Sequence, residues 1–231
     1  MTWHAKRTGS YAATSQEAYD NAMESFAIMY NDYGWTKAAC CGVFGNIDFE
    51  GVWNPWRWES DNVRSVAQSQ SDHGYSHGYG LIGWTPSGKY IWDNFTFTYQ
   101  GQTYYYFPNY HQQGYPGYGP NFSDQAGLAT DGAAQIKLIC EAMSRGNTNI
   151  WVNRKGCTAS RFITLTDPEE AAYYWLWNAE YPADPEGQEA RRKSHARDWY
   201  NRLPATPQGG SHASMDIILF KKAIDHSQGR L

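Results

Sequence analysis

Apolar residues recur at helical spacing in two neighbouring segments near the start of the chain. In residues 14–34, an apolar stripe follows Thr14 and Glu17, which have the spacing of a capping box, and Gly34 closes the segment. The stripe consists of Ala22, Phe26, Met29, Tyr30 and Tyr33. Thr36 can cap the next segment, whose single stripe runs through Ala39, Val43, Ile47 and Glu50. The sequence therefore predicts two helices that pack as a hairpin across a short turn at Gly34-Trp35.

The middle of the chain shows no sustained helical period. Residues 51–86 are polar and rich in Ser, Gly and Trp, which predicts loops or short strands. Residues 95–99 and 103–107 are rich in aromatic residues and Thr and flank Gln100-Gly101-Gln102, the pattern of a β-hairpin. Residues 110–122 combine Gly and Pro with Tyr, which is typical of a loop.

Helical patterns return in the second half of the chain. We expect helices over residues 131–144, from Asp167-Pro168 to about Ala179, and over residues 186–202. The expected organisation is one domain, residues 1–204, followed by a linker and a short terminal helix within residues 205–231. The expected fold class is α+β: mainly helical, with the β-hairpin region beside a cleft.

Composition and charge narrow the classes of function. Aromatic residues make up 16% of the chain, with 11 Trp and 18 Tyr, which suits a saccharide-binding cleft as well as an aromatic core. The net charge of −4 argues against nucleic acid and against a polybasic membrane surface as partners. The sequence contains no apolar run of about 18 residues, and its start lacks the apolar core of a signal peptide, so we expect no membrane insertion.

Glu50 is the most unusual residue of the apolar stripes. It shares a stripe with Val43 and Ile47 and lies at the predicted end of a helix. Burial and the partial negative charge of a helix C-terminus would both raise the pKa of its carboxyl, as a general acid near neutral pH requires. Gly51 can release the chain there, so that the carboxyl faces a cleft. The hypothesis fails if Glu50 lies away from any groove or is held ionised by a permanent arginine partner.

Three motifs around and after Glu50 occur in a fixed order. They are Gly45-Asn46 with Glu50, then Asn54-Pro55, then Gly78-Tyr79-Gly80-Leu81-Ile82-Gly83-Trp84-Thr85-Pro86. Together they resemble the phage tail lysozyme family and, more distantly, goose-type lysozymes and soluble lytic transglycosylases. Residues 191–200 also resemble that family's closing helix, so the resemblance covers most of residues 13–203. Two positions depart from the family pattern: Gly51 stands where Ser is usual, and Gly83 where Gln is usual.

The resemblance implies cleavage of peptidoglycan at the β-1,4 bond between N-acetylmuramic acid and N-acetylglucosamine, with Glu50 as general acid and no cofactor. It implies Asp72 as the second catalytic carboxylate, with Asp61 as the alternative. The side chains expected to bind the glycan are Trp53, Asn54, Trp56, Tyr79, Trp84 and Thr85, with Tyr104 and Tyr106 extending the platform. The alternative is that Asn54-Pro55 only shapes a turn and that Gly78 and Gly80 only allow close approach of the backbone. If no second carboxylate reaches the site, attack by the muramic acid hydroxyl would make the enzyme a lytic transglycosylase.

The resemblance also implies a setting. The protein would belong to the tail of a phage virion and open the bacterial wall, with peptidoglycan glycan strands as its partner and other phage tail proteins as further candidates. A free lysis enzyme made in the host cytoplasm is the alternative setting. A non-catalytic wall-binding or tail-structural protein is the competing class, and the glycines at 51 and 83 favour it.

Two other chemistries have weaker support in the sequence. Asp72, His73 and His77 suggest a zinc site, but the glycines beside them indicate a loop and no third strong ligand is adjacent, so we expect no metal. A peptidase built on Cys157 has no nucleophile motif to support it. Cys40 and Cys41 are most simply buried apolar residues, whereas Cys140 and Cys157 are candidates for a disulfide.

Overall fold

The computed structural model describes a helical protein together with one two-stranded ribbon. It describes residues 3–6, 9–50, 52–57, 59, 78, 80–83, 95–99, 102–106, 125–144 and 150–207, without the side chains of residues 95–99, 102–106 and 125–131. The helices are α1 (Gln16–Ala27), η1 (Ile28–Asp32), α2 (Lys37–Ile47), α5 (Gln125–Ser144), α6 (Ala159–Phe162), α7 (Pro168–Trp175), η3 (Leu176–Glu180) and α8 (Pro185–Arg202). The strands are β1 (Phe95–Tyr99) and β2 (Gln102–Tyr106), and η1 and η3 are π-helical continuations of α1 and α7.

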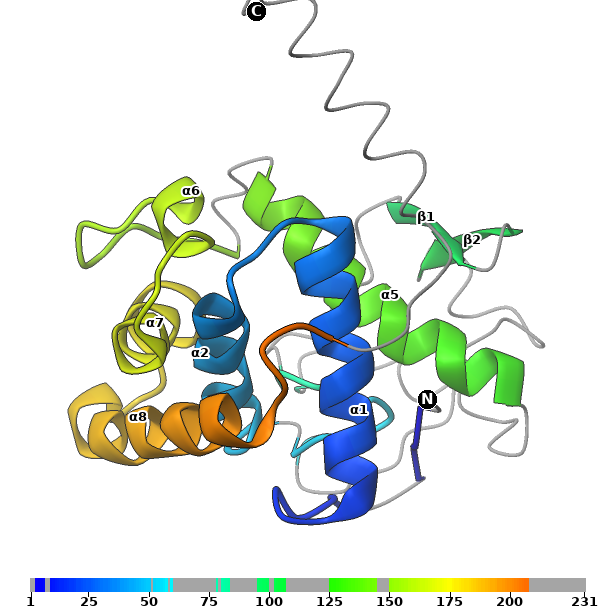
Figure 1. The fold of residues 1–231 in the computed structure, drawn as a ribbon, viewed down its shortest axis with the longest axis horizontal. Coiled ribbons are helices and arrows are strands. Elements are labelled where there is room, and N and C mark those ends of the chain that lie inside the picture. The colour runs from blue at the N-terminus through cyan, green and yellow to red at the C-terminus, as the bar shows by residue number, and fades with distance from the viewer. Residues whose placement is uncertain are drawn as a thin grey trace, which may run out of the picture.

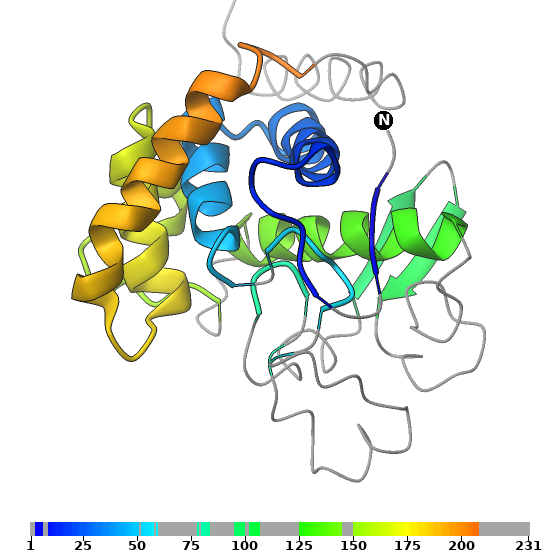
Figure 2. The same cartoon turned by 90° about the horizontal axis from the view of Figure 1, so that it is seen from below.

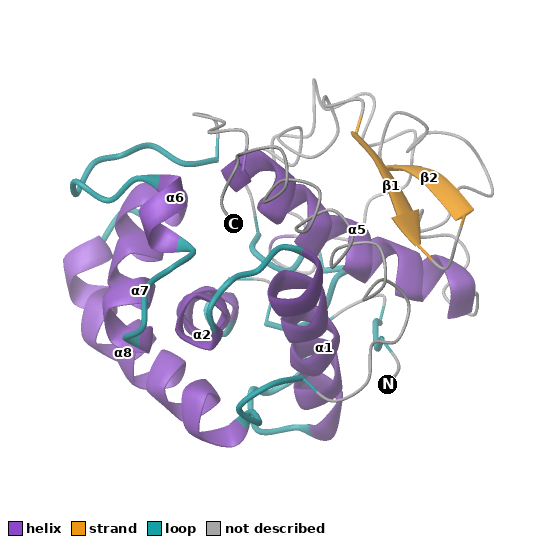
Figure 3. Cartoon of the chain, turned by 45° about the horizontal axis from the view of Figure 1, so that its top comes forward, coloured by secondary structure: helices purple, strands orange, loops and turns teal. Residues whose placement is uncertain are grey.

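Helix α2 lies at the centre of the molecule. Every residue from Ala38 to Ile47 is buried, and Figures 1 and 3 show α1, α7 and α8 around this helix. The helix begins where the sequence predicts, because the Thr36 hydroxyl accepts a hydrogen bond from the Ala39 amide at 3.1 Å. Its main packing partners are α7 and α8, so α1 and α2 do not form the predicted hairpin by themselves.

Two glycines of α2 allow α7 and α8 to approach closely. A Cβ atom at Gly42 would lie 2.4 Å from the Cβ of Ala171 in α7. A Cβ atom at Gly45 would lie 2.5 Å from the carbonyl oxygen of Arg192 in α8. Any side chain at either position would therefore push a neighbouring helix away. The close approach at Gly45 brings Arg192 to the C-terminal end of α2.

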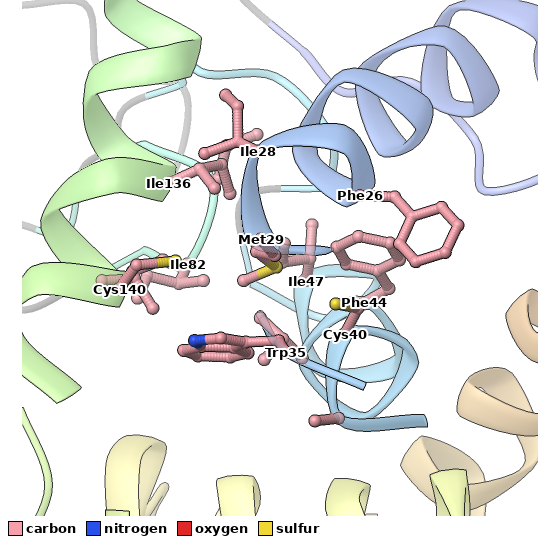
Figure 4. Packing of buried hydrophobic residues seen from close by; sticks show 14 of the residues in the cluster. Phe26, Ile28, Met29, Trp35, Cys40, Phe44, Ile47, Ile82, Ile136 and Cys140 are labelled. Carbon is pink, nitrogen blue, oxygen red and sulfur yellow. The ribbon is translucent and has the colours of Figure 1, made fainter. Parts of the chain in front are cut away.

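The hydrophobic core is built where α1, η1, α2 and α5 meet. Figure 4 shows side chains from these helices in one cluster, including Phe26, Met29, Phe44 and Ile136. All four are fully buried, and burial of a large apolar side chain contributes roughly 1.5–3 kcal/mol. This core fixes the end of α2, from which the candidate site projects.

The predicted α+β fold class is wrong, because the core of the described chain is helical. Strands β1 and β2 pair antiparallel, with Phe95 opposite Tyr106, at positions where the sequence predicts strands. No other strand occurs among the described residues, and two five-residue strands are too few to form a sheet layer. The ribbon lies against α5, at the opposite end of the molecule from α7 and α8 (Figures 1 and 2), whereas Glu50 follows α2. The hairpin is therefore a small ribbon on α5 and not a second structural layer beside a cleft.

Several predicted boundaries also change. The cap of α1 is Ser15, whose hydroxyl accepts from the Ala18 amide, and not Thr14. Helix α2 ends at Ile47, three residues before Glu50, and α5 begins at Gln125, six residues before the predicted start. The predicted linker and terminal helix lie almost entirely beyond residue 207, outside the described residues.

Neither a disulfide nor a membrane-spanning helix is found among the described residues. Cys140 and Cys157 are both buried and free, so the candidate disulfide does not form. Within the described part of the chain, no helix has both the length and the apolar character needed to cross a bilayer.

Candidate active site

Glu50 lies in a turn just beyond the C-terminus of α2. The amide of Phe49 donates to the Asn46 carbonyl at 2.9 Å, and the amide of Glu50 donates to the Ile47 carbonyl at 3.1 Å. The Glu50 carbonyl in turn accepts from Arg57 Nη1 at 3.1 Å. The side chain of Glu50 is 24% exposed, so its carboxyl is neither sealed in the core nor fully solvated.

The chain reverses immediately after Glu50 through two strained residues. Val52 and Trp53 have φ angles of +46° and +60°, in the left-handed region, where each non-glycine residue costs roughly 1–2 kcal/mol. Three hydrogen bonds hold this reversal: the Val52 amide to the Ile47 carbonyl at 2.9 Å, the Tyr11 amide to the Val52 carbonyl at 3.0 Å, and the Asn21 amide group to the Trp53 carbonyl at 2.6 Å. The direction of the Glu50 segment is therefore fixed by its surroundings.

Arg192 of α8 holds one oxygen of the Glu50 carboxyl. Its Nη2 atom lies 2.5 Å from Glu50 Oε1, and Nη1 donates to Asn46 Oδ1 at 2.8 Å. Gln188 Oε1 accepts from Nη2 at 2.6 Å and from Nε at 3.2 Å, and the arginine side chain is only 1% exposed. A buried guanidinium with this many acceptors has a defined position. The carboxyl that the sequence predicts to be unpaired therefore has a buried arginine as its partner.

The second oxygen of Glu50 faces the Gly83 backbone. A Cβ atom at Gly83 would lie 3.5 Å from Glu50 Oε2, which is ordinary van der Waals contact. A side chain at this position would start beside the carboxyl, so the glycine leaves room next to Oε2. The two oxygens thus differ, because Arg192 holds Oε1 while Oε2 faces the turn that carries Gly83.

The three sequence motifs meet around this carboxyl. The Gly80 amide donates to the Arg57 carbonyl at 2.9 Å, and the Glu59 amide donates to the Gly78 carbonyl at 2.8 Å. These bonds join the turn of residues 80–83 to the segment that follows Asn54-Pro55. The Gly45-Asn46 motif contributes through α8. Gly45 allows α8 to pack closely against α2, and Asn46 accepts a hydrogen bond from Arg192.

Three of the residues predicted to bind the glycan, Trp53, Trp56 and Asn54, are buried. Trp53 is 0% exposed and Trp56 is 3% exposed, and the indole of Trp53 donates to Asp48 Oδ1 at 2.6 Å. Asn54 is 0% exposed, and its amide group donates to the carbonyls of Lys6 and Gly9, each at 2.8 Å. These side chains hold the turn after Glu50 together and present no surface to a saccharide.

The remaining predicted site residues lie outside the described part of the chain. They are Asp61, Asp72, Tyr79, Trp84 and Thr85. The backbone of Tyr104 pairs with Phe97 in the ribbon, but neither its side chain nor that of Tyr106 is described. Their predicted roles stay predictions.

Asp48 is a second carboxylate close in sequence to Glu50, and it has a structural role. Its side chain is 2% exposed and lies 2.7 Å from His195 Nδ1, while the Trp199 indole donates to Oδ2 at 3.0 Å. The hydrogen bond to Asp48 raises the pKa of His195 above its ordinary value, against the opposing effect of burial. With Trp53 on its other oxygen, Asp48 ties the end of α2 to α8 and to the turn after Glu50.

Sequence reasoning missed Arg192 and Asn46 as parts of the site. The available signals were the resemblance of residues 191–200 to a family helix and the position of Asn46 in the Gly-Asn motif. Neither signal identifies a contact partner, because the two residues are 146 positions apart in the chain.

The alternative chemistries gain no support from the described residues. Within that part of the chain, no three His, Cys, Asp or Glu side chains form a metal-binding group, and Asp72, His73 and His77 lie outside it. Cys157 is buried, and burial raises the pKa of its thiol, which makes it a poor nucleophile.

A surface hollow of about 360 Å³ is present elsewhere in the protein. It is lined by Asp167, Glu169, Glu170, Tyr173 and Lys193, and Glu50 is not part of it. Its charged side chains are engaged: Glu169 pairs with Arg197, Glu170 with Arg161 and Lys193 with Glu189, while Asp167 caps α7. We therefore place the candidate site at Glu50 and not at this hollow.

Comparisons with known proteins bear on the identity of the chain. The model of a family described as "Phage tail lysozyme" matches residues 20–203, a range that includes Glu50, Gly83 and Arg192. The chain is also similar to "Morphogenesis protein 1" of Bacillus phage B103, with 28% identity over 190 residues. That alignment covers 80% of this chain and 40% of the relative, so this chain spans less than half of the relative's length.

Proposed function

The chain belongs to the phage tail lysozyme family, and we propose that it cleaves the β-1,4 bond between N-acetylmuramic acid and N-acetylglucosamine in peptidoglycan. Glu50 acts as the general acid. The observation that carries this proposal is the position of its carboxyl, which is partly exposed, held by a buried arginine and placed where the three family motifs meet.

The two oxygens of Glu50 have different tasks in the proposed reaction. A protonated carboxyl keeps one acceptor oxygen, so Arg192 can continue to bind Oε1 while Oε2 carries the proton. The proton passes from Oε2 to the bridging glycosidic oxygen as the bond from that oxygen to the anomeric carbon breaks. The carboxylate that remains is then stabilised by Arg192.

The ion pair with Arg192 means that Glu50 must take up a proton before this step. A saccharide that covers Oε2 removes water from the carboxyl, and desolvation favours the uncharged form. Only 24% of the Glu50 side chain is exposed, so a bound ligand can complete its burial. We infer that the acid is formed in the complex with the glycan.

The fate of the anomeric carbon separates two versions of the proposal. In the hydrolytic version, a carboxylate, with Asp72 as the candidate, positions the attacking water. In the lytic transglycosylase version, the hydroxyl of the muramic acid attacks, and the product is an anhydro-sugar. Mass spectrometry of the released fragments distinguishes the reducing end of hydrolysis from the anhydro-sugar.

One observation favours a second candidate function, a wall-binding or tail-structural protein without catalysis. Glu50 is paired with a buried arginine, and Trp53 and Trp56 are buried. A carboxyl that stays ionised in the complex would leave a protein that binds peptidoglycan and does not cut it. The similarity to a phage morphogenesis protein fits either function.

The proposed setting is the tail of a phage particle, with peptidoglycan glycan strands as the partner. Family membership supports a role in a phage, and a free lysis enzyme is the alternative. Immunodetection of the protein in purified virions tests this, because a free lysis enzyme would be found only in the lysate.

Clearing of purified bacterial walls tests the proposed function. We expect the wild-type protein to reduce turbidity and Glu50→Gln to reduce it far more slowly, while still binding walls in a sedimentation assay. Glu186→Gln is the matched control, because Glu186 is exposed at the start of α8 and should clear walls like the wild type. Binding by the wild-type protein without any clearing would support the non-catalytic function.

A further inference from the structure

Gln135 of α5 is a fully buried polar residue that no catalytic step uses. Its side chain is 0% exposed, and both ends of its amide group are hydrogen bonded to backbone atoms. The Leu81 amide donates to Gln135 Oε1 at 2.8 Å, and Gln135 Nε2 donates to the Pro55 carbonyl at 2.8 Å. One side chain therefore joins two of the three motif segments.

The turn of residues 80–83 lies directly on this amide group. A Cβ atom at Gly80 would be only 2.4 Å from Gln135 Oε1, and Gly80 has a φ angle of +85°. Glycine is thus required here both by the backbone conformation and by contact with Gln135. The Gly83 amide donates to the Gly80 carbonyl at 3.2 Å. The position of Gly83 therefore depends on that of Gly80.

Both segments that Gln135 joins lead to Glu50. Pro55 follows Glu50 by five residues, through the strained reversal at Val52 and Trp53. Gly83 lies on the other side of the carboxyl, facing Oε2. The base of this connection is buried, since Ile136 and Cys140 of α5 belong to the same hydrophobic cluster as Ile82 of the turn (Figure 4).

We propose that Gln135 is a positioning residue for Glu50: it sets the distance between the Gly83 backbone and the proton-carrying oxygen. This inference rests on the proposed function of Glu50. The Gln135 side chain bonds to the backbone of Leu81 and Pro55, so it acts on Glu50 through the 80–83 turn.

The amide side chain is suited to this role because it donates and accepts at the same time. A methionine of similar length would make neither bond and would leave the Leu81 amide and the Pro55 carbonyl without this partner in a buried place. A glutamate would accept from Leu81 in either state, but it donates to Pro55 only when protonated. Glutamine therefore makes both bonds, methionine makes neither, and glutamate makes the bond to Pro55 only when it is protonated.

The first test compares Gln135→Met with the wild type in wall clearing and in hydrogen exchange. We expect the exchange of the Leu81 amide to accelerate and the maximal clearing rate to fall about 10–100-fold, with wall binding little changed, because small misplacements of catalytic groups cost rate. Gln16→Met on α1 is the control, since the Gln16 side chain is exposed and donates to Asp20 at the surface. Clearing by Gln135→Met at the wild-type rate would overturn the inference.

The second test keeps the size of the side chain and changes its protonation. For Gln135→Glu, we expect the clearing rate relative to wild type to rise as the pH falls, because the protonated carboxyl regains the donor to Pro55. Circular dichroism at each pH shows that the compared samples are folded, so that a loss of folded protein does not account for a change in the ratio. A ratio that does not change with pH would also overturn the inference.

These outcomes separate the inference from the proposed function. A wild-type protein that never clears walls refutes the catalytic function and with it a catalytic role for Gln135. A wild-type protein that clears walls, together with an equally active Gln135→Met, refutes the role of Gln135 alone.

Discussion

The guanidinium of Arg192 lies 2.5 Å from one carboxyl oxygen of Glu50, and the arginine is buried while the carboxyl is partly exposed. This contact joins α8 to the end of α2 across 142 positions of sequence. It gives the carboxyl one fixed oxygen and one oxygen that faces Gly83. Glu50 is therefore oriented by a residue that is itself buried.

Arg192→Gln should lower both the rate of wall clearing and the stability of the protein. Without the guanidinium, Oε1 of Glu50 loses the buried partner that fixes the orientation of the carboxyl. The maximal rate should fall, and the free energy of unfolding should drop by roughly 1–3 kcal/mol, because Asn46 and Gln188 lose a buried partner.

Arg191→Gln is the control for this change. Arg191 is exposed and lies over the Phe49 ring, so its loss removes a nearby charge without touching the carboxyl. A maximal clearing rate of Arg192→Gln that matches both the wild type and Arg191→Gln would show that the ion pair does not orient Glu50.

Gly45→Ala should loosen the contact between α2 and α8. The added Cβ would lie 2.5 Å from the Arg192 carbonyl oxygen and 2.7 Å from the Ala196 amide nitrogen. Backbone atoms of a helix cannot relieve such a contact by changing rotamer, so the helices must move apart. Overpacking of this kind costs roughly 1–3 kcal/mol, which lowers the Tm by about 2–12 °C. Clearing should fall at a temperature where the variant is still folded, because Arg192 moves with α8. Calorimetry and clearing assays check both effects, with the exposed Ser194→Ala as a control.

The bond between His195 and Asp48 should make stability depend on pH. The pKa of His195 is raised in the folded protein, chiefly by the hydrogen bond to Asp48. Its contribution to stability is therefore complete below the ordinary value of 6.5 and is lost as the pH rises through the folded pKa. Asp198 acts in the same direction, and the Arg191 charge opposes it.

The Tm of wild type and His195→Gln measures this effect, since glutamine does not titrate. We expect the advantage of the wild type to be larger at about pH 5.5 than at about pH 8.5. An advantage that is the same at both pH values, or larger at the higher one, would show that His195 is not held by Asp48 in the folded state.

The four cysteines should be unreactive in the folded protein. All four are buried and free, and burial raises the pKa of each thiol, to about 12 for Cys41. A thiol reagent at about pH 8 should label none of them until the protein is unfolded, and then all four without a reductant. If one thiol of the folded protein is labelled rapidly, and this labelling is absent in Cys157→Ser, then Cys157 is a reactive nucleophile and the prediction is wrong.

Local signals in the sequence predicted the helix starts best. Thr36 and Asp167 cap their helices as expected, because a capping side chain acts within three residues of itself. The sequence pattern predicts a start of α5 six residues too late, because Gly127 and Gly132 weaken the helical pattern. In the structure Gly132 has a packing reason, since a Cβ there would lie 2.3 Å from the Trp3 ring.

The candidate site was predicted in part. Glu50 could be singled out because its charge interrupts an apolar stripe, but whether an aromatic ring faces the core or a ligand cannot be told from its type. Trp53 is the clearest case, since its ring is buried between Phe44 and Trp199. Arg192 and Gln135 could not be found, because each acts through a contact between elements that are distant in the sequence.

The release of soluble glycan fragments from purified peptidoglycan by wild type and Glu50→Gln tests the central claim most directly. Loss of a general acid costs about 10²–10⁴-fold in rate, so Glu50→Gln should release fragments slower by that factor, while Glu186→Gln releases them at the wild-type rate. Calorimetry should show both variants folded at the assay temperature. Release by Glu50→Gln at the wild-type rate would contradict the assignment of Glu50 as the acid.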